Sequence, residues 1–183
     1  MLVLLDRDGV INRDDKVGIL RVQDFAFLPG AVSAIARLTN AGFRIAVCTN
    51  QSAVGRGQLS VAELDAIHAH MCAGIEQAGG RIDRVYYAPD IPEAATARRK
   101  PGPGMLQEAL AEFGADASRT PMVGDMLRDL QAAHAAGCPR ILVRTGKGAH
   151  TEAQGLPAEI QPVTVVDDLD AAVTHILAHY AGA

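Results

Sequence analysis

The sequence is poor in cysteine and in aromatic residues. Its 183 residues contain no tryptophan, three tyrosines, four phenylalanines and only three cysteines, Cys48, Cys72 and Cys138. The cysteines are scattered and form no Cys-x-x-Cys pair, so a disulfide framework is not expected, whereas a reducing compartment is. The apolar runs are only a few residues long, which is too short for a membrane span or a signal peptide. These absences predict a cytoplasmic protein without a membrane partner.

The sequence also lacks any long run of basic residues. Its formal net charge is −4, and the arginine pair at 98–99 is too short to form a basic patch, so no nucleic-acid partner is expected. Hydrophobic residues make up 49% and charged residues 21% of the chain, as in ordinary globular domains. We expect residues 1–183 to form a single domain with a proper core and to act as a monomer.

Predicted strands and helices alternate along the whole chain. Ser60 and Glu63 have the spacing of a capping box and mark the start of one helix. Most of the apolar strands lack alternation of polar and apolar residues, which is typical of parallel strands buried on both faces. We therefore predict an α/β fold, a doubly wound, three-layer α/β/α arrangement around a parallel sheet. The predicted strands are residues 2–6, 43–50, 81–89, 120–125, 139–146 and 162–169, and the predicted helices are residues 30–42, 60–80, 104–114, 127–137 and 170–181.

Polar residues follow four of these strands at the point where each strand ends. In a doubly wound sheet the carboxyl ends of the strands form the edge at which ligands bind, so these side chains should converge. Asp129 also has a simpler interpretation, because an acidic residue in the first turn of a helix is favoured by the helix dipole. The converging residues are Asp6 and Asp8 after the first strand, Thr49 and Asn50 after the second, Lys100 after the third, and Asp125 and Asp129 after the fourth.

This set of side chains suits phosphoryl transfer. Asp6, Asp8 and Asp125 offer oxygen ligands to one Mg²⁺ ion, which would offset the repulsion between the carboxylates. An aspartate can attack phosphorus to form an aspartyl-phosphate, and a second carboxyl group two residues on can exchange a proton with the leaving oxygen. Thr49 and Lys100 supply donors for the phosphoryl oxygens as their charge increases.

Four segments together resemble the four signatures of the haloacid dehalogenase-like (HAD) phosphohydrolases, in the same order. They are "DRDGV" at 6–10, "TN" at 49–50, "KP" at 100–101 and "GDMLRD" at 124–129. The resemblance implies a Rossmann-like fold with Asp6 as the nucleophile and Asp8 as the general acid and base. It also implies Mg²⁺ held by the Asp6 carboxylate, the Asp8 backbone carbonyl and the Asp125 carboxylate, with Asp129 as a supporting acidic residue.

Longer matches resemble one subgroup of this family, which contains the D-glycero-D-manno-heptose 1,7-bisphosphate 7-phosphatases and the histidinol-phosphate phosphatases. The segment "NQSAVGRG" at 50–57 favours the heptose branch. On this resemblance a small phosphorylated metabolite is the substrate, and Arg99 holds one of its phosphates. Arg56 is a further candidate, although it equally fits a solvated loop arginine. The remaining residues that the resemblance places at the substrate are Asp14, Asp15, Lys16, Val17, Asn50, Gln51 and Ser52.

Two features depart from the subgroup's pattern. Many members carry a structural zinc loop, but here Ala88, Asp90, Thr96 and Arg98 stand in place of its cysteine and histidine ligands, so structural zinc is not expected. Met126 stands where the heptose enzymes often have a lysine that contacts the substrate. No large insertion is evident, so we expect a capless enzyme with an open pocket. All six histidines, His68 among them, are interpreted as solvated residues.

The sequence therefore predicts a Mg²⁺-dependent phosphomonoesterase. The favoured substrate is the 7-phosphate of D-glycero-D-manno-heptose 1,7-bisphosphate, in the pathway to activated heptose for surface polysaccharides. Alternatives are a histidinol-phosphate phosphatase and a polynucleotide 3′-phosphatase, although the acidic net charge counts against the latter. A binding module without catalysis is a further alternative, since a fold does not fix an activity. A pure binder, however, has no need for both Asp6 and Asp8.

Overall fold

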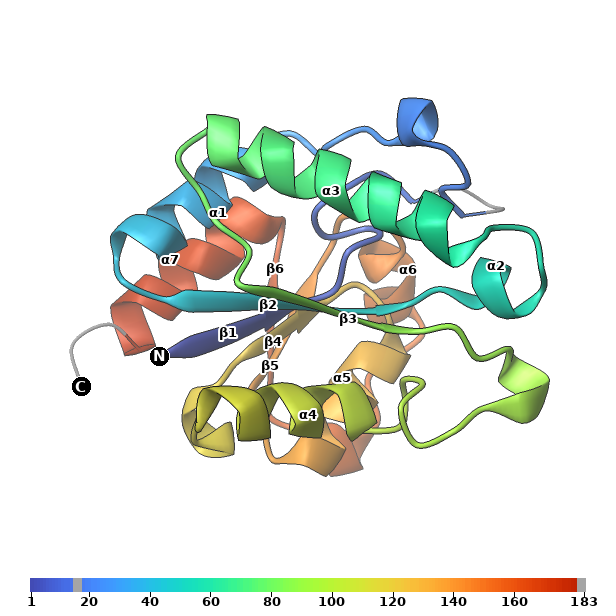
Figure 1. The fold of residues 1–183 in the computed structure, drawn as a ribbon. Coiled ribbons are helices and arrows are strands. Elements are labelled where there is room, and N and C mark those ends of the chain that lie inside the picture. Colours follow the sequence, from blue (N-terminus) through green and yellow to red (C-terminus); the bar gives the residue numbers. More distant parts are fainter. Residues whose placement is uncertain (15–17, 181–183) are drawn as a thin grey trace.

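The computed structural model describes residues 1–14 and 18–180. Within these residues, six parallel strands form one sheet in the order β3-β2-β1-β4-β5-β6 (Figure 1). The chain winds outward from β1 in one direction and restarts at β4 in the other, which is the predicted doubly wound topology. The strands are β1 Leu2–Leu5, β2 Arg44–Asn50, β3 Arg84–Ala88, β4 Met122–Gly124, β5 Arg140–Val143 and β6 Val163–Val166.

Helices cover both faces of the sheet and complete three layers. Figure 1 shows α1 (Ala31–Asn40), α3 (Val61–Gln77) and α7 (Leu169–Tyr180) on one face, and α4 (Gly104–Phe113) and α5 (Leu127–Ala136) on the other. The five predicted helices and the six predicted strands are thus confirmed, with ends that shift by a few residues. Two short helices, α2 (Ser52–Gly55) and α6 (Gly148–Ala153), were not predicted, because four to six residues carry too little periodicity.

The core explains why the strands lack polar alternation. In β1, Leu2 and Leu4 pack toward α4 and α5, while Val3 and Leu5 pack toward α1, α3 and α7. All four side chains are buried, and each contributes about 1.5–3 kcal/mol relative to exposure. The predicted capping box also forms: the Glu63 amide donates to Ser60 Oγ at 3.2 Å, and the Ser60 amide donates to Glu63 Oε2 at 2.8 Å.

The described loops at the carboxyl edge of the sheet contain no cap domain. In the described part of residues 6–30, after β1, the only helical element is the 3₁₀ turn Val22–Asp24, and in the loop after β3 it is the 3₁₀ turn Pro92–Ala94. The site edge is therefore open, as predicted for a capless enzyme. In the described part of the chain, no helix combines the length and the apolar character needed to cross a membrane.

Candidate active site

Three buried carboxylates meet at the carboxyl edge of the sheet. Asp6 follows β1, Asp125 follows β4, and Asp129 lies in the first turn of α5. One carboxylate oxygen from each lies within 4.8 Å of the others. The adjacent positions of β1 and β4 bring Asp6 and Asp125 together, although the two residues lie far apart in the sequence. Among the described histidine, cysteine and acidic residues, this is the only group of three that could share a cation.

Lys100 supplies a buried positive charge to this cluster. Its Nζ lies 3.0 Å from Asp6 Oδ1 and 2.8 Å from Asp129 Oδ1, and its side chain is fully buried. Burial alone would lower the pKa of Lys100, but the negative charges of Asp129 and Asp6 outweigh it and raise the pKa. The lysine is therefore charged at neutral pH. Three ionised carboxylates around one lysine leave a net charge of about −2, which a divalent cation would neutralise.

The pKa values of the carboxylates also indicate that a cation would stabilise this cluster. Burial raises the pKa of Asp6 to about 6; the Lys100 charge opposes this, whereas the charges of Asp129 and Asp8 add to it. Burial, followed by the charges of Asp129 and Asp6, raises the pKa of Asp125 to about 8. The bare cluster therefore holds its negative charges poorly, and an oxygen-binding cation such as Mg²⁺ would stabilise them. The donor set, all oxygen and buried, fits that ion.

The backbone around Asp125 fixes its carboxylate. The Lys147 amide donates to Asp125 Oδ2 at 2.8 Å, and Thr151 Oγ1 donates to the Asp125 carbonyl at 2.9 Å. Gly9 and Gly146 both have positive φ, 82° and 58°, and pack so closely that a Cβ at either would collide with the Asp125 carboxylate. Both positions therefore require glycine for conformation and for space.

Asp129 has two roles that the sequence left as alternatives. Its Oδ2 accepts a hydrogen bond from the Met126 amide at 2.9 Å, which satisfies a free amide at the start of α5. Its Oδ1 is the oxygen that contacts Lys100. Asp129 is therefore both a helix-end acceptor and a member of the acidic cluster.

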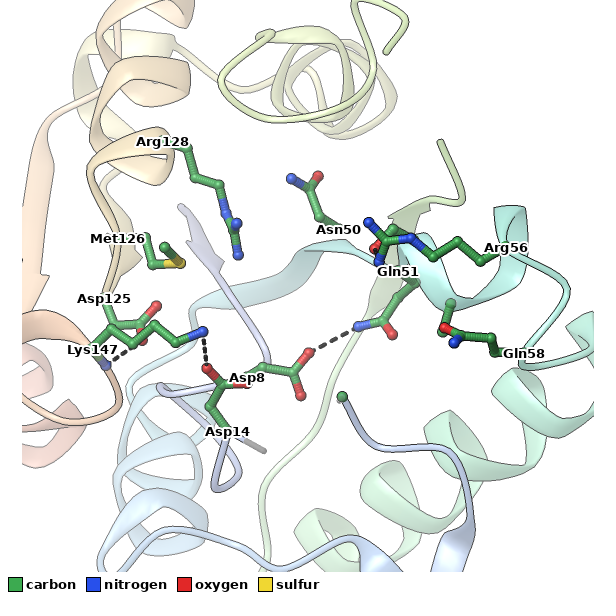
Figure 2. Close-up of a pocket in the computed structure, with 13 residues that line it drawn as sticks. Asp8, Asp14, Asn50, Gln51, Arg56, Gln58, Asp125, Met126, Arg128 and Lys147 are labelled. Carbon is green, nitrogen blue, oxygen red and sulfur yellow. Dashed lines mark hydrogen bonds and ion pairs between the residues drawn. The ribbon is translucent and has the colours of Figure 1, made fainter. Parts of the chain in front are cut away.

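Asp8 is held apart from the three clustered carboxylates. Arg7 donates to both of its oxygens, Asn12 Nδ2 donates to Oδ1 at 2.9 Å, and Gln51 Nε2 donates to Oδ2 at 2.9 Å (Figure 2). Burial would raise the pKa of Asp8, but the Arg7 charge and these hydrogen bonds lower it. Gln51 Nε2 also lies 2.9 Å from Thr49 Oγ1, so Gln51 links Asp8 to the end of β2.

A cavity of about 430 Å³ opens beside these carboxylates. Figure 2 shows the labelled side chains around this cavity, which come from elements as distant in the sequence as β2 (Asn50) and α5 (Arg128). Of the predicted substrate residues, Asp14, Asn50, Gln51, Ser52 and Arg56 line this cavity, together with Asp8 and Asp125. Asp15, Lys16 and Val17 lie outside the described residues. The lining also includes Met126, Arg128 and Lys147.

Asn50 and Arg99 form hydrogen bonds with the protein backbone. Asn50 Nδ2 donates to the Lys100 carbonyl at 2.9 Å, and the Lys100 amide donates to Asn50 Oδ1 at 3.0 Å. This pair of bonds fixes the backbone from which Lys100 reaches the cluster. Arg99 Nη1 donates to the Asp90 carbonyl at 2.7 Å, and Arg99 is not among the residues that line the cavity.

Hydrogen bonds order the loop after β3, where the sequence leads us to expect no structural zinc. Asp90 Oδ2 accepts from the Thr96 amide at 2.8 Å and from Thr96 Oγ1 at 2.5 Å. The Gly104 amide donates to the Ala97 carbonyl at 2.9 Å. Together with the bond from Arg99 to Asp90, these contacts within the loop hold the backbone that leads to Lys100 in place.

Sequence reasoning missed four residues around the site, and for one of them its prediction was wrong. His68 is 7% exposed and contacts Arg7, so it is not a solvated histidine. It follows Ile67 on the buried stripe of α3, and that position was the available signal. Arg7 lies between the two aspartates of the first motif and is fully buried. Arg128 and Lys147 lie in the motifs after β4 and β5, but only the structure shows that they line the cavity.

An open parallel sheet with this acidic cluster, lysine and cavity defines a HAD-like hydrolase, and the HAD-hydrolase-like family model matches residues 97–172. The chain is 42% identical over 177 residues to the D-glycero-beta-D-manno-heptose-1,7-bisphosphate 7-phosphatase of Bordetella bronchiseptica, covering 96% of this chain and 97% of that one. The chain belongs to the family of these HAD phosphatases.

Other relatives and a solved structure agree. The enzyme of the same name from Pseudomonas aeruginosa is 40% identical over 176 residues, with 96% of this chain and 97% of that protein covered. A crystal structure of D,D-heptose 1,7-bisphosphate phosphatase from B. bronchiseptica, complexed with magnesium and phosphate, superposes with a TM-score of 0.92. The match covers 97% of this chain and 98% of that one at 42% identity.

Proposed function

We propose that this protein is a Mg²⁺-dependent phosphatase that removes the 7-phosphate of D-glycero-D-manno-heptose 1,7-bisphosphate. The observation that carries the chemistry is the buried cluster of Asp6, Asp125 and Asp129 around Lys100, beside an open cavity. The names of the relatives, at about 40% identity over nearly the whole chain, support the substrate.

We place the enzyme in the cytoplasm as a monomeric single domain, in the pathway to activated heptose for surface polysaccharides such as lipopolysaccharide. Its three cysteines are free thiols, which fits a reducing compartment.

Mg²⁺ would be held by the carboxylates of Asp6 and Asp125 and the backbone carbonyl of Asp8, with Asp129 in support, and would supply positive charge to the phosphoryl oxygens. An Asp6 oxygen attacks phosphorus, and the bond from phosphorus to the sugar oxygen breaks. The two donors to the Asp6 carboxylate in the described structure, the Arg7 amide and Lys100 Nζ, both reach Oδ1. Oδ2 is therefore the oxygen more available for attack.

Asp8 moves the protons in both halves of the reaction. The bound phosphate brings negative charge beside Asp8, which favours its protonated form. In the first half Asp8 gives this proton to the departing sugar oxygen. In the second half it takes a proton from water, whose oxygen attacks phosphorus while the bond from phosphorus to Asp6 breaks. Inorganic phosphate leaves, and both carboxyl groups return to their starting states.

Arg56 and Arg128 form a basic rim at the cavity. This rim favours a substrate that carries a second phosphate. Burial lowers the pKa of Arg99, and the positive charges of Arg128 and Arg56 lower it further, so both of these guanidinium groups lie close enough to repel Arg99. Within the described residues, neither Arg56 nor Arg128 forms an ion pair with a carboxylate. A phosphate held between them would relieve the repulsion, and guanidinium groups bind its oxygens in pairs. We propose that the 1-phosphate occupies this rim.

A substrate panel with two variants tests the proposal. Phosphate release is measured with heptose 1,7-bisphosphate, histidinol phosphate and a 3′-phosphorylated oligonucleotide. We expect the heptose bisphosphate to give the highest kcat/KM; a much better rate with histidinol phosphate would refute the substrate. Asp6→Asn should abolish turnover while sparing binding, and hydrolysis that survives it would refute the covalent mechanism. Asp8→Asn should slow turnover by about 10²–10⁴-fold.

A further inference from the structure

Arg7 is a charged side chain enclosed in the protein interior. It is among the largest fully buried side chains, and its exposed fraction is 0%. A buried guanidinium is costly unless charged and polar partners surround it. Its partners are therefore informative about its role. Within the described residues its side chain contacts a carboxylate on one side, Asp8, and a histidine on the other, His68.

The contact between Arg7 and Asp8 fixes a carboxylate in orientation as well as in position. Arg7 Nη2 donates to Asp8 Oδ1 at 2.9 Å and to Oδ2 at 3.0 Å, and Nε lies 3.2 Å from Oδ1. Because the guanidinium is planar and reaches both oxygens, it restrains rotation of the Asp8 carboxyl group. The turn beneath is closed too, since the Arg7 carbonyl accepts from the amides of residues 10, 11 and 12.

His68 holds the opposite edge of the guanidinium. Arg7 Nη1 lies 3.2 Å from His68 Nε2. A guanidinium can only donate, so Nε2 must be the acceptor, which assigns the ring proton to Nδ1. Burial, and after it the Arg7 charge, lower the pKa of His68 to about 4 against a smaller opposing effect of Asp8, so the ring is neutral and able to accept. The contact links Arg7 to α3.

Helix α3 provides a rigid support for this histidine. Its buried side chains Leu64, Ile67, Met71 and Ile75 belong to the core, and the capping box fixes its first turn. The ring of His68 also lies beside that of Tyr87 in β3, with 6.2 Å between the ring centroids. A continuous series of contacts therefore runs from the core through His68 and Arg7 to the Asp8 carboxylate.

We propose that Arg7 and His68 are positioning residues that orient Asp8 for proton transfer to the leaving oxygen. The inference rests on the proposed function, because it concerns the acid of that reaction. Neither residue is among those that line the cavity in the described structure, so both act through Asp8 rather than on the substrate. Their loss should therefore affect steps that need the Asp8 proton and leave substrate binding nearly unchanged.

Three variants separate positioning from packing. His68→Leu removes the acceptor, whereas His68→Gln keeps an acceptor at a comparable reach and should restore most of the activity. Arg7→Lys keeps the buried charge but cannot hold both Asp8 oxygens, so it should behave like His68→Leu. His134→Leu is the matched control, because His134 is an exposed histidine on α5. Thermal unfolding of each variant confirms that the assayed protein is folded.

Two leaving groups give the decisive readout. A sugar phosphate needs a proton on its departing oxygen, whereas p-nitrophenolate leaves without one. With heptose 1,7-bisphosphate, His68→Leu and Arg7→Lys should lower kcat by about tenfold or more while KM stays within about twofold. In rapid-quench experiments with p-nitrophenyl phosphate, the rate of the first phosphoryl transfer should match wild type. The His134→Leu control should match wild type with both substrates.

The outcomes distinguish this inference from the proposed function. Equal losses with both leaving groups, or no loss with either, would overturn the positioning role while leaving the phosphatase proposal intact. Failure of His68→Gln to restore more activity than His68→Leu would overturn it as well. If the wild-type protein hydrolyses no phosphomonoester, or if Asp6→Asn keeps full activity, the proposed function itself fails.

Discussion

Mild acid should destabilise the folded protein through His68. The pKa of this ring is lowered from 6.5 to about 4 by burial and by the Arg7 charge. Below pH 6.5 the unfolded chain binds a proton at this residue, but the folded protein does not until the pH approaches 4. The unfolded state therefore gains free energy from protonation within this window. Stability falls as the pH falls, and the loss from His68 is complete below about pH 4.

The size of the effect follows from the two pKa values. Each pKa unit corresponds to about 1.4 kcal/mol, and between about pH 7 and pH 4.5 most of the shift is expressed. The expected loss in the free energy of unfolding is about 2 kcal/mol. For a chain of this length, that loss lowers the melting temperature by about 4–8 °C.

Urea denaturation of wild type and of His68→Gln at about pH 7 and about pH 4.5 measures how much His68 contributes to this loss of stability. EDTA is present throughout, so that metal binding does not differ between the two pH values. Carboxylates that titrate in both proteins cancel when the pH-dependent loss in the variant is subtracted from that in wild type. The remainder should be about 2 kcal/mol and should favour the variant in acid. A remainder near zero would mean that the folded protein readily accommodates a charged His68, and the argument for a buried neutral acceptor would be refuted.

Three further results are expected from the site. Lys100→Met should abolish turnover and lower the free energy of unfolding by about 3–5 kcal/mol in urea titrations, because Asp6 and Asp129 lose their buried partner. Mg²⁺ at about 100 times its Kd should stabilise wild type by about 2.7 kcal/mol over the EDTA-treated protein, and Asp125→Asn should remove this difference in thermal melts. Arg128→Gln should raise KM for heptose 1,7-bisphosphate by about tenfold or more and leave KM for p-nitrophenyl phosphate unchanged, because only the bisphosphate reaches the rim.

The fold was predictable because its signals are local. Continuous apolar strands, the Ser60 capping box and glycine at helix ends each act within a few residues, and the alternation of elements then selects a doubly wound sheet. The short helices α2 and α6 lack such signals. Both lie at the carboxyl edge of the sheet, where tertiary contacts such as Thr151 with the Asp125 carbonyl hold them in place.

The convergence of the site was predictable, whereas the direction of its side chains was not. Parallel strands place their carboxyl ends on one edge, so residues that follow β1 and β4 had to meet. Nothing in the sequence shows that Asp8 turns toward Arg7 or that Asn50 bonds the backbone of Lys100. His68 was misinterpreted for a related reason. A polar residue on a buried helix face needs a hydrogen-bond partner, and the partner of His68, Arg7, lies 61 positions away in the sequence.

Different residues carry the proposed chemistry and the proposed choice of substrate. Asp6, Asp125 and Lys100 are buried, and each contacts another member of the cluster or a backbone amide, so the fold fixes their positions. Arg56 and Arg128 line the open cavity, where we expect their replacement to change substrate binding at little cost to the fold. Met126 brings no charge to this cavity, but Arg128 lines the same cavity two residues further along and supplies a positive charge there.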